Sequence, residues 1–384
     1  MAVRGVVAFM LGDRAVAPEG RRVVLVERAE TSSDAASTAL ASLIVVAYNG
    51  RDHLERCLRS ILSQDTCPDE IIVVDNASSD GGADFVEQTF PSVVVVRSQV
   101  NRGFGHGANV GARIAHGDYL VFLNPDTVVE PGWLTGLVAA LEAHPEAGLA
   151  TARILLLRQP DRVNACGTEV HFTGLALCRG VEADRDHFPE IEEVGAVSGA
   201  AFAIRQTAFR EIAGFDERFF LYMEDIDLSW RARLAGYTCL YAPGSVVGHD
   251  YALAIGANKV YLEERNRYLM LLKNLRWPTL LALIPALILA EVVTWGFVLL
   301  CDRPHALNKP RAYFWVARHW WQILASRRET RVRRRIRDRD LLARCAHRIA
   351  FEQVGKGHQA RLAHRVFDPS FLVLWRLTLA LVRW

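Results

Sequence analysis

The fold is indicated by residues 42–80, which read SLIVVAYNGRDHLERCLRSILSQDTCPDEIIVVDNASSD. An apolar run at Leu43–Ala47 is followed by helical periodicity over Asp52–Gln64, and a second apolar run at Ile71–Val74 ends in Asp75. Short β-branched runs that alternate with helices predict parallel βαβ units. We therefore expect an α/β fold in which helices cover both faces of the sheet.

The same alternation continues to residue 123. Further strand-like runs lie at Val93–Val96 and Tyr119–Leu123, and a helical segment lies between them at Ala108–Ala115. In sheets of this kind ligands bind beyond the carboxyl ends of the strands, so polar residues at those ends are candidates for chemistry. Three groups of polar residues directly follow apolar runs: Tyr48 with Asn49, Asp75 with Asn76, and Asn124 with Asp126.

Charge is distributed unevenly along the 384 residues, although the net charge is only +2. Residues 1–300 hold 26 basic and 37 acidic side chains, net −11, whereas residues 301–384 hold 19 and 6, net +13. Such a tail predicts contact with an anionic surface, either phospholipid or nucleic acid. With 51% hydrophobic residues the chain is not of the disordered class. Seven cysteines without a CxxC pair argue against a disulfide framework and against a zinc ribbon.

The first 41 residues precede this pattern. The apolar stretch at Met1–Leu11 is not followed by a small-residue cleavage site, so we do not expect a signal peptide. Residues 31–41 are rich in Ala, Ser and Thr, as linkers are. We expect an N-terminal extension and linker at 1–41, with no role assigned, and a main domain that begins at residue 42.

Two local motifs allow a ligand-binding and a purely structural interpretation. Asp75, which follows a buried strand, either stabilises a turn or accepts hydrogen bonds from a ribose or a base. Residues 103–111 read GFGHGANVG and open a helix, but they match neither the dinucleotide nor the P-loop spacing. Their glycines are equally typical of close packing at the start of a helix.

The tripeptide Asn124-Pro125-Asp126 follows a hydrophobic strand. A carboxylate in this place is suited to a diphosphate and its divalent cation, because Mg²⁺ or Mn²⁺ commonly needs only one or two carboxylates besides substrate phosphates. A turn with proline at its second position explains the same tripeptide without a ligand.

The strongest local signal lies at residues 214–231, which read GFDERFFLYMEDIDLSWR. Glu224, Asp225 and Asp227 open a helix that we expect to run to Ala235. Acidic residues at a helix N-terminus cap the helix and complement its dipole. Three of them within four residues exceed what capping requires, and a carboxylate beside aromatic residues is a candidate general base toward a hydroxyl group.

The order of these motifs resembles that of the family 2 glycosyltransferases, in particular the bacterial rhamnosyltransferase-like enzymes of cell-surface polysaccharide synthesis. The resemblance covers residues 42–275 and implies a GT-A fold, in which a nucleotide-binding half precedes an acceptor-binding half. It rests on seven motifs: VAYN (46–49), VDNASSD (74–80), NRGFG (101–105), FLNPD (122–126), GFDE (214–217), EDID (224–227) and GH (248–249).

The resemblance also implies roles for individual residues. Asp225 is expected as the catalytic base, Asp126 and His249 as ligands of a divalent cation (Mg²⁺ or Mn²⁺), and Glu224 with Trp230 on the acceptor side. The donor nucleotide sugar is expected to contact Ala47, Tyr48, Asn49, Asp75, Asn76, Arg102, Asn109, Asn124 and Asp126. Asn124 departs from the Asp-x-Asp metal motif of the family, since an amide can accept hydrogen bonds but brings no charge.

The implied reaction is a single displacement with inversion at the anomeric carbon. We expect dTDP-rhamnose as the donor, with a UDP-sugar next, and a lipid-linked or polysaccharide acceptor in cell-envelope glycan synthesis. One alternative, prompted by Asn124, is a protein that binds sugar nucleotides without transfer. Nucleic-acid binding through the basic tail leaves the ordered acidic motifs unexplained, and the glycine spacing disfavours an oxidoreductase.

Residues 276–384 are expected to associate with a membrane. Leu280–Leu300 contains a single charge, Glu291, and is long enough to cross a bilayer. Eight arginines follow within Arg327–Asp340, and such segments stay cytoplasmic, as does a sugar-nucleotide site. We therefore expect the chain at the cytoplasmic face of the plasma membrane, with the apolar segment interfacial, re-entrant or spanning. The alternatives are a two-pass hairpin that uses Arg311–Ala325 and a buried core helix.

Overall fold

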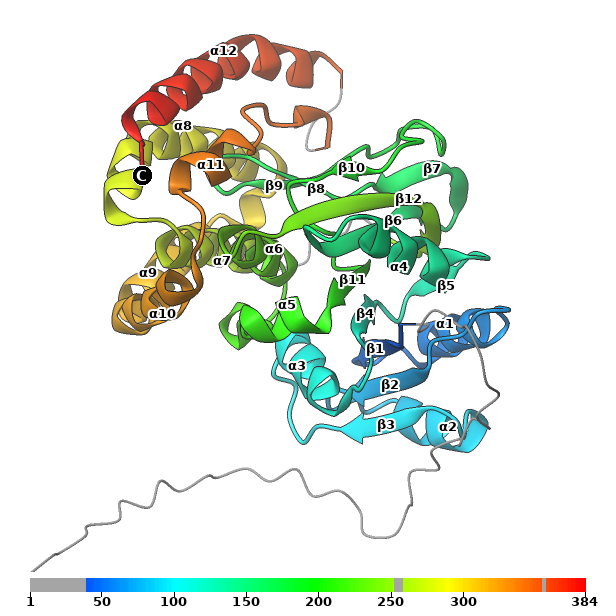
Figure 1. The fold of residues 1–384 in the computed structure, drawn as a ribbon. Coiled ribbons are helices and arrows are strands. Elements are labelled where there is room, and N and C mark those ends of the chain that lie inside the picture. Colours follow the sequence, from blue (N-terminus) through cyan, green and yellow to red (C-terminus); the bar gives the residue numbers. More distant parts are fainter. Residues whose placement is uncertain (1–38, 252–257, 354–356) are drawn as a thin grey trace, which may run out of the picture. The chain divides into compact units, whose positions relative to one another are not determined.

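The computed structural model describes residues 39–251, 258–353 and 357–384, so most of the expected extension at 1–41 lies outside the described residues. Residues 39–384 form one compact unit around a mixed sheet (Figure 1). The order of its strands is β10-β12-β6-β11-β4-β1-β2-β3, with β5 beside β12 and β7 beside β6. These strands are β1 (Ala41–Ala47), β2 (Glu70–Asp75), β3 (Val94–Arg97), β4 (Tyr119–Leu123), β5 (Thr127–Val129), β6 (Ala147–Leu156), β7 (Gln159–Ala165), β10 (Glu192–Glu193), β11 (Ala201–Arg205) and β12 (Thr238–His249).

The N-terminal half of the sheet confirms the expected parallel βαβ units. Strands β3, β2, β1 and β4 are parallel neighbours, and helices α1 (Arg51–Leu62) and α2 (Gly82–Thr89) connect them. Helix α3 (Phe104–Ile114) begins four residues before the position expected from the sequence. The reason is packing: a Cβ on Gly107 would lie 2.6 Å from Val46, and one on Gly111 2.6 Å from Ile44. These glycines therefore belong to the helix and let it approach the sheet.

The second half of the sheet is mixed, because β11 is antiparallel to both β4 and β6 whereas β12 is parallel to β6. Side chains of α1 and α4 (Trp133–Ala143) pack on one face of the sheet. Those of α3, α5 (Gln206–Glu211) and α6 (Glu224–Leu234) pack on the other. Helices thus cover both faces, as the sequence predicts. Strands β8 (Thr168–Val170) and β9 (Ala176–Cys178) form a separate hairpin.

The C-terminal helices pack directly onto this α/β core. One hydrophobic cluster joins Phe172 and Trp230 of the catalytic half to Leu283, Leu341 and Phe371 of the C-terminal region. No separate compact unit therefore begins at the expected boundary near residue 275.

The remaining helical elements are η1 (Glu217–Phe219), α7 (Lys259–Asn274), α8 (Trp277–Cys301), η2 (Arg303–His305), α9 (Asn308–Arg318), α10 (Trp320–Arg333), α11 (Asp338–Ala343), η3 (Phe351–Gln353) and α12 (His358–Leu381).

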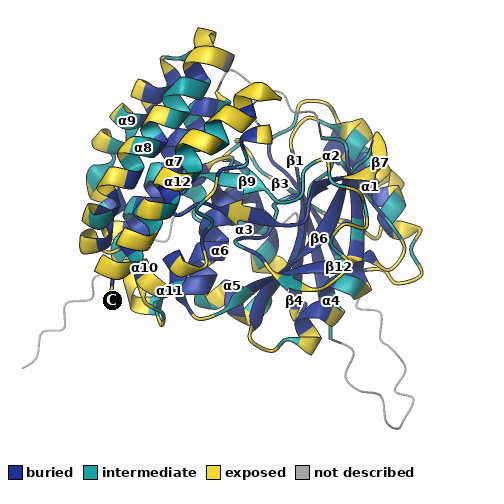
Figure 2. Cartoon of the chain, turned by 90° about the horizontal axis from the view of Figure 1, so that it is seen from above, coloured by how far each residue is buried: buried dark blue, intermediate teal, exposed yellow. Residues whose placement is uncertain are grey.

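Helix α8 has two different faces. Among the described residues it is the one helix long and apolar enough to be a candidate membrane span. Only 22% of its most apolar window is buried, whereas a core helix would be mostly buried. Figure 2 shows the exposed and intermediate residues along it. Its charged residue faces the protein, where Glu291 lies 2.5 Å from Arg267 and 3.1 Å from Lys309. The exposed side carries a helical stripe of apolar residues: Trp277, Leu281, Ile284, Ile288, Val292 and Leu299.

Candidate active site

The carboxyl ends of β1 and β2 lie side by side, which brings the first expected donor-binding residues together. Ala47 is paired with Asp75, and the backbone N–H of Asn76 donates to the carbonyl of Ala47 at 2.8 Å. Asp75 is largely buried and accepts a hydrogen bond from the backbone N–H of Ser78 at 3.0 Å. Tyr48, at 53% exposure, stands open beside it. This edge presents one carboxylate and one aromatic ring to a ligand.

A residue for which the sequence alone predicts no role organises this edge. Asp80 accepts hydrogen bonds from the backbone N–H groups of Gly50 at 2.7 Å and Arg51 at 2.9 Å, at the start of α1. Asn49 accepts the N–H of Ser79 at 2.8 Å. Burial alone would raise the pKa of Asp80, but its backbone hydrogen bonds outweigh burial and lower that pKa. Asp80 therefore holds the turn after β1 as a stable carboxylate.

Asn76 supports the neighbouring 101–103 loop. Its side-chain amide donates to Asn101 Oδ1 at 2.9 Å and to the carbonyl of Gly103 at 3.1 Å, and Asn76 itself is buried. Arg102, which we expect at the donor, is exposed, with its guanidinium 3.7 Å from Glu217. The structure thus gives Asn76 a positioning contact and leaves Arg102 accessible.

Asn109 is likewise engaged with the protein. Its side chain forms hydrogen bonds to both the N–H and the carbonyl of Phe215, each at 2.9 Å, and a third to Glu217 at 3.2 Å. Because these contacts use both ends of the amide, Asn109 joins α3 to the 214–217 segment. The sequence predicts a contact with the donor; in the structure this amide forms hydrogen bonds to Phe215 and Glu217.

The backbone of Gly103 packs tightly against the backbone of Phe220. It has φ +91°, and a Cβ built on it would lie 2.1 Å from the carbonyl oxygen of Phe220. That contact places the 101–105 motif against the loop that leads to Asp225. Phe220, Tyr222 and Met223 all have φ between 64° and 68°, so this loop is strained.

The Gly103→Ala variant is expected to lose about 2–5 kcal/mol of unfolding free energy, because a left-handed conformation and a steric clash add together. Gly132→Ala is the matched control: Gly132 has φ +79°, and a Cβ added to it would meet no atom within 4 Å, so only about 1–2 kcal/mol should be lost. Denaturant unfolding measures both. Equal losses in the two variants would show that the contact with Phe220 is unimportant.

Asp126 and His249 meet at the expected cation site. Strand β5 pairs with β12 so that Thr127 lies opposite His249, and His249 Nε2 is 3.3 Å from Asp126 Oδ1. His249 Nδ1 lies 3.0 Å from Asn164 Oδ1. In the tautomer in which Nδ1–H donates to Asn164, the Nε2 lone pair faces Asp126, and metal-ligating histidines are held in this way.

These residues fit a divalent cation. Asp126 Oδ1 is buried and makes no hydrogen bond within the described part of the chain. Burial would raise the pKa of Asp126, but attraction to His249 when its Nε2 carries a proton outweighs burial and lowers that pKa. A cation between the two groups would take the place of that proton. No group of three or more His, Cys, Asp or Glu side chains suited to a metal occurs in the described ranges. A cation here would have two protein ligands and would take the rest from substrate phosphates and water.

The expected base, Asp225, lies in the first turn of α6. Its Oδ2 accepts the backbone N–H of Gly199 at 2.8 Å, and burial raises the pKa of its carboxyl. The next residue, Ala200, accepts the backbone N–H of Asn124 at 2.9 Å. The 199–200 segment therefore bridges the expected base and the Asn124–Asp126 turn. The only sequence signal for this bridge is a glycine just before an apolar strand.

The three acids of the EDID motif (Glu224, Asp225, Asp227) have separate environments. Asp227 is fully buried and paired with Lys273 at 2.7 Å and Arg231 at 2.7 Å, so it ties α6 to α7. Glu224 is also buried, and its Oε2 lacks a hydrogen-bond partner among the described residues. Trp230, expected to contact the acceptor, is 1% exposed and packs in the hydrophobic cluster, because it lies on the inner face of α6.

The buried carboxyl of Glu224 should make the free energy of unfolding depend on pH. Burial, and then the charge of Asp225, raise its pKa from 4.5 to about 8. The folded state therefore holds a proton that the unfolded state releases, so this residue's contribution to stability is lost as pH rises from about 4.5 to about 8. Glu224→Gln removes that dependence, and its Tm relative to wild type should rise between pH 5 and pH 9.

Glu217→Gln serves as the control of opposite sign. Burial opposes the shift, but contacts with His106 and Asn109 lower the pKa of Glu217. That carboxylate therefore adds stability above its unfolded pKa and loses it as pH falls, so the control should lose Tm relative to wild type as pH rises from acid to neutral. Parallel pH profiles for the two variants would contradict both assignments.

Helix α7 holds the loop that precedes the base. Asn266 is fully buried, and its amide lies 2.9 Å from the carbonyls of Phe219 and Leu221 and 2.7 Å from that of Tyr222. The sequence after His249 is that of an ordinary helix, so it gives no indication that Asn266 has a special role. The three contacts of Asn266 explain how the strained loop is kept in place.

A cavity of about 180 Å³ lies between α8 and Met223, which precedes Asp225 by two residues. Leu177, Met223 and Val260 form one end of it, and Val293 and Phe297 of α8 form the other. Burial, and then the charge of Asp225, raise the pKa of the Cys178 thiol, which follows Leu177 in the chain, to about 11. Most of the cavity lining is apolar, although Glu263, Glu264, Arg267 and Lys309 also contribute, and the cavity reaches the apolar helix α8.

This mixed sheet is the fold of the GT-A class of glycosyltransferases. Polar residues suited to a nucleotide lie at the carboxyl ends of β1 and β2, and the carboxylate of Asp225 lies on the other side of the site. Residues 42–162 match the family described as Glycosyl transferase family 2, and residues 119–326 match Glycosyl transferase family group 2. The second match spans more than half of the chain. The chain therefore belongs to the family 2 glycosyltransferases, and it is an enzyme of that kind.

Individual relatives agree with this assignment. The chain is 28% identical over 262 residues to the N-acetylglucosaminyl-diphospho-decaprenol L-rhamnosyltransferase of Mycobacterium tuberculosis, covering 61% of this chain and 84% of the relative. It is 27% identical over 212 residues to the pre-mycofactocin glycosyltransferase of the same organism, covering 55% and 42%. The sequence resemblance to rhamnosyltransferase-like enzymes is thus confirmed at the level of family.

Two solved structures share the fold. GalNAc-T7 with UDP, GalNAc and Mn²⁺ superposes with a TM-score of 0.54 at 20% identity, over 64% of this chain and 50% of that one. Staphylococcus aureus TarS 1–349 with UDP-GlcNAc superposes with a TM-score of 0.50 at 16% identity, over 88% and 90%. The GT-A fold expected from the sequence is confirmed.

Proposed function

We propose that this enzyme transfers a sugar, with inversion, from a nucleoside-diphosphate donor to a hydroxyl group of a lipid-linked acceptor in cell-envelope glycan synthesis. The observation that carries the proposal is the bridge at Gly199 and Ala200, which joins Asp225 to the Asn124–Asp126 turn. A base and a diphosphate site held by one short segment suit a single displacement. The name of the mycobacterial relative supports a rhamnosyl donor and a polyprenyl diphosphate acceptor.

Asp225 takes the acceptor proton in this proposal. Burial raises the pKa of its carboxyl, which makes the carboxylate a stronger base than one in water. The N–H of Gly199 fixes Oδ2 at 2.8 Å, and this contact orients the side chain before an acceptor binds. Glu224, which carries a proton at neutral pH, adds no second negative charge beside the acceptor.

The donor would lie along the strand edge. In this proposal Asp75 and Tyr48 contact the nucleoside together with Ala47, Asn49 and Arg102. Asn76 and Asn109 support the neighbouring segments through their hydrogen bonds to Asn101 and Phe215. Asp126 and His249 would hold a divalent cation, with Asn124 beside them as an uncharged acceptor. That cation supplies positive charge against the leaving diphosphate.

Thermal stabilisation of the purified protein by sugar nucleotides with Mn²⁺ tests the proposal. A ligand at 100 times its Kd adds about 2.7 kcal/mol to the free energy of unfolding. At equal concentrations the true donor, which binds most tightly, should therefore give the largest rise in Tm. We expect dTDP-rhamnose to rank first and a UDP-sugar next. The free nucleotides without sugar are the controls, and a panel in which no sugar nucleotide raises Tm would refute the proposal.

The acceptor and the membrane belong to the same proposal. The cavity between Met223 and α8 is lined mainly by apolar side chains, and the exposed stripe of α8 supports an interfacial position at the cytoplasmic face of the plasma membrane. Glu291 is turned toward the protein and paired with Arg267, which favours a helix lying along the surface with one face on the enzyme. A lipid-linked acceptor could then present its sugar to Asp225 without leaving the bilayer.

A further inference from the structure

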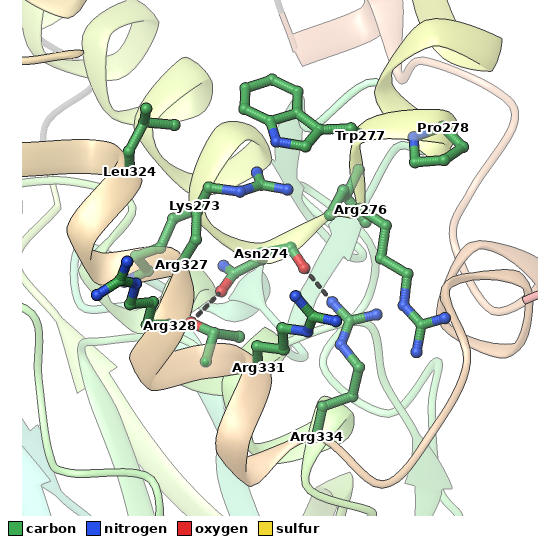
Figure 3. A pocket seen from close by; sticks show the side chains of 12 residues that line it. Lys273, Asn274, Arg276, Trp277, Pro278, Leu324, Arg327, Arg328, Arg331 and Arg334 are labelled. Carbon is green, nitrogen blue, oxygen red and sulfur yellow. Dashed lines mark hydrogen bonds between the residues drawn. The ribbon is translucent and has the colours of Figure 1, made fainter. Parts of the chain in front are cut away.

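A second cavity, of about 540 Å³, lies away from the catalytic groups, where α7 ends, α8 begins and α10 passes (Figure 3). No aspartate or glutamate lines it. Its lining is Lys273, Asn274, Leu275, Arg276, Trp277, Pro278, Leu324, Arg327, Arg328, Thr330, Arg331 and Arg334. The cavity is therefore strongly basic, and we call it the arginine pocket.

Several of these cations already have partners. Lys273 is paired with Asp216 at 2.6 Å and with Asp227 at 2.7 Å, and Arg334 is paired with Asp338. The guanidinium of Arg327 lies 4.2 Å from the centre of the Trp277 ring. The nearby carboxylates of Asp216, Asp227 and Asp338 are thus already paired. They do not offset the positive charge of the other arginines that line the pocket.

Three guanidinium groups in the pocket have no such partner. Arg276, Arg328 and Arg331 are exposed and form no ion pair with any residue in the described ranges. Positive charge is crowded here: burial, and then the charge of Arg334, lower the pKa of Arg327. Several arginine forks converging on one cavity are suited to a phosphate group.

The pocket lies at the end of an apolar surface. Trp277 begins the exposed stripe of α8, and α12 runs antiparallel beside it, with Trp384 Nε1 donating to Thr279 at 2.8 Å. A groove of about 610 Å³ between the two helices is lined by Ile288, Val292 and Val373 among other mainly apolar side chains. A phosphate in the pocket would therefore sit where a lipid surface would meet the protein.

The pocket is separate from the reaction centre. Asp225, Asp126 and His249 do not line the pocket. The pocket residue Lys273 contacts Asp227 at 2.7 Å, and Asp227 lies two residues beyond Asp225. At about 100° per residue the two carboxylates therefore point to roughly opposite sides of α6. An anion in the pocket is thus not the diphosphate of the donor.

We propose that the arginine pocket binds the phosphate headgroup of an anionic phospholipid, with the acyl chains along the apolar stripes of α8 and α12. The inference rests on the proposed membrane association and not on the identity of the donor or acceptor. Charge complementarity selects an anionic headgroup, and the adjoining apolar stripe, with Trp277 at its start, favours a lipid over a free ion.

Co-sedimentation of the full chain with phosphatidylcholine vesicles, with and without phosphatidylglycerol, tests this proposal. We expect binding that depends on phosphatidylglycerol, and about 30-fold weaker binding by the double variant Arg328→Gln with Arg331→Gln. Both arginines are exposed and unpaired within the described residues, so the fold should persist. An unchanged rise in Tm with sugar nucleotide would verify that it does.

The matched control is Arg59→Gln with Arg162→Gln, which removes the same charge from exposed sites on α1 and β7, on the opposite side of the unit from α8 (Figure 1). It should bind within about twofold of wild type, since charges beyond the Debye length contribute little. An equal loss in both double variants would overturn the pocket in favour of diffuse charge.

Calorimetry separates the two sources of phosphate. A short-chain, water-soluble phosphatidylglycerol should bind the wild type and fail to bind the pocket variant, whereas inorganic phosphate should bind at least tenfold more weakly than that lipid. Equal affinity for inorganic phosphate would overturn the lipid assignment. Wild-type protein that binds sugar nucleotide but no phosphatidylglycerol vesicle would overturn the inference and leave the proposed transferase activity standing.

Discussion

Replacing Asp225 by Asn is expected to lower the rate of sugar transfer by about 100- to 10,000-fold and to leave donor affinity within about twofold of wild type. The amide is nearly isosteric with the carboxyl, and its oxygen can still accept the N–H of Gly199. Its NH₂ group cannot accept the N–H of Ile226 as Oδ1 does at 2.9 Å, so one local hydrogen bond is lost while the first turn of α6 should persist. What is lost is a basic oxygen of raised pKa beside the acceptor hydroxyl. Transfer assays and donor calorimetry on the same preparation measure the two effects.

Asp227→Asn is the matched control, two residues further along α6. Asp227 is buried between Lys273 and Arg231, so its substitution breaks a buried ion-pair network and should cost about 3–5 kcal/mol of stability. The two variants therefore separate a chemical role from a structural one. Asp225→Asn with full transfer activity would refute the assignment of the base.

Replacing Asp126 by Ala is expected to weaken Mn²⁺-dependent donor binding by more than about 100-fold, because the loss of a ligand should exceed the 10–100-fold effect of losing an outer contact. Asp126 is one of two protein groups placed to hold the cation, and its Oδ1 is buried without a hydrogen bond in the described part of the chain. Calorimetry of the sugar nucleotide with Mn²⁺, and again with a chelator, measures the difference.

Asn164→Ala provides a graded comparison for that experiment. Asn164 does not face the cation; it contacts His249 Nδ1 at 3.0 Å and would act only by orienting the ring. A 10–100-fold weakening of Mn²⁺-dependent binding is therefore expected, smaller than that of Asp126→Ala. If the Asp126 variant kept the same gain in affinity from Mn²⁺ as wild type, the cation site would have to lie elsewhere.

The parallel half of the sheet could be predicted because its signals are local. Strands at Leu43–Ala47 and Tyr119–Leu123 are nearly continuous apolar runs, and such runs are buried on both faces by helices. The expected strand at Val93–Val96 is shifted by only one residue, to Val94–Arg97. The sequence places the start of α3 too late because glycine usually marks the outside of a helix, whereas here Gly107 packs against Val46.

The expected site residues divide according to whether their side chains are free for a ligand or are engaged with the protein. Asp126 and His249 are expected at a shared cation site, and they meet at 3.3 Å because β5 pairs with β12. Asn76 and Asn109 carry equally suggestive motifs, yet their amides bond to neighbouring loops. A hydrogen-bonding residue beside a binding site can face the ligand or the protein, and one sequence does not distinguish the two.

The groups that hold the site together give no usable signal in the sequence. Gly199 contacts Asp225 from 26 positions away, and Asn266 contacts the loop at Phe219–Tyr222 from the middle of α7. Each is an ordinary residue in its local context. Their role comes from closing contacts between distant elements, which periodicity and motif spacing do not encode.

By itself, the sequence determined the α/β class, the carboxylates available for chemistry and the division of the chain into an acidic part and a basic tail, since these follow from residue type and periodicity. Only the tertiary structure decided that Asp225 is free of ion pairs within the described residues while Asp227 is held by Lys273, and that the arginines of the tail converge at the start of α8. Burial and pairing set what a charged side chain can do, and both depend on neighbours that are distant in the sequence.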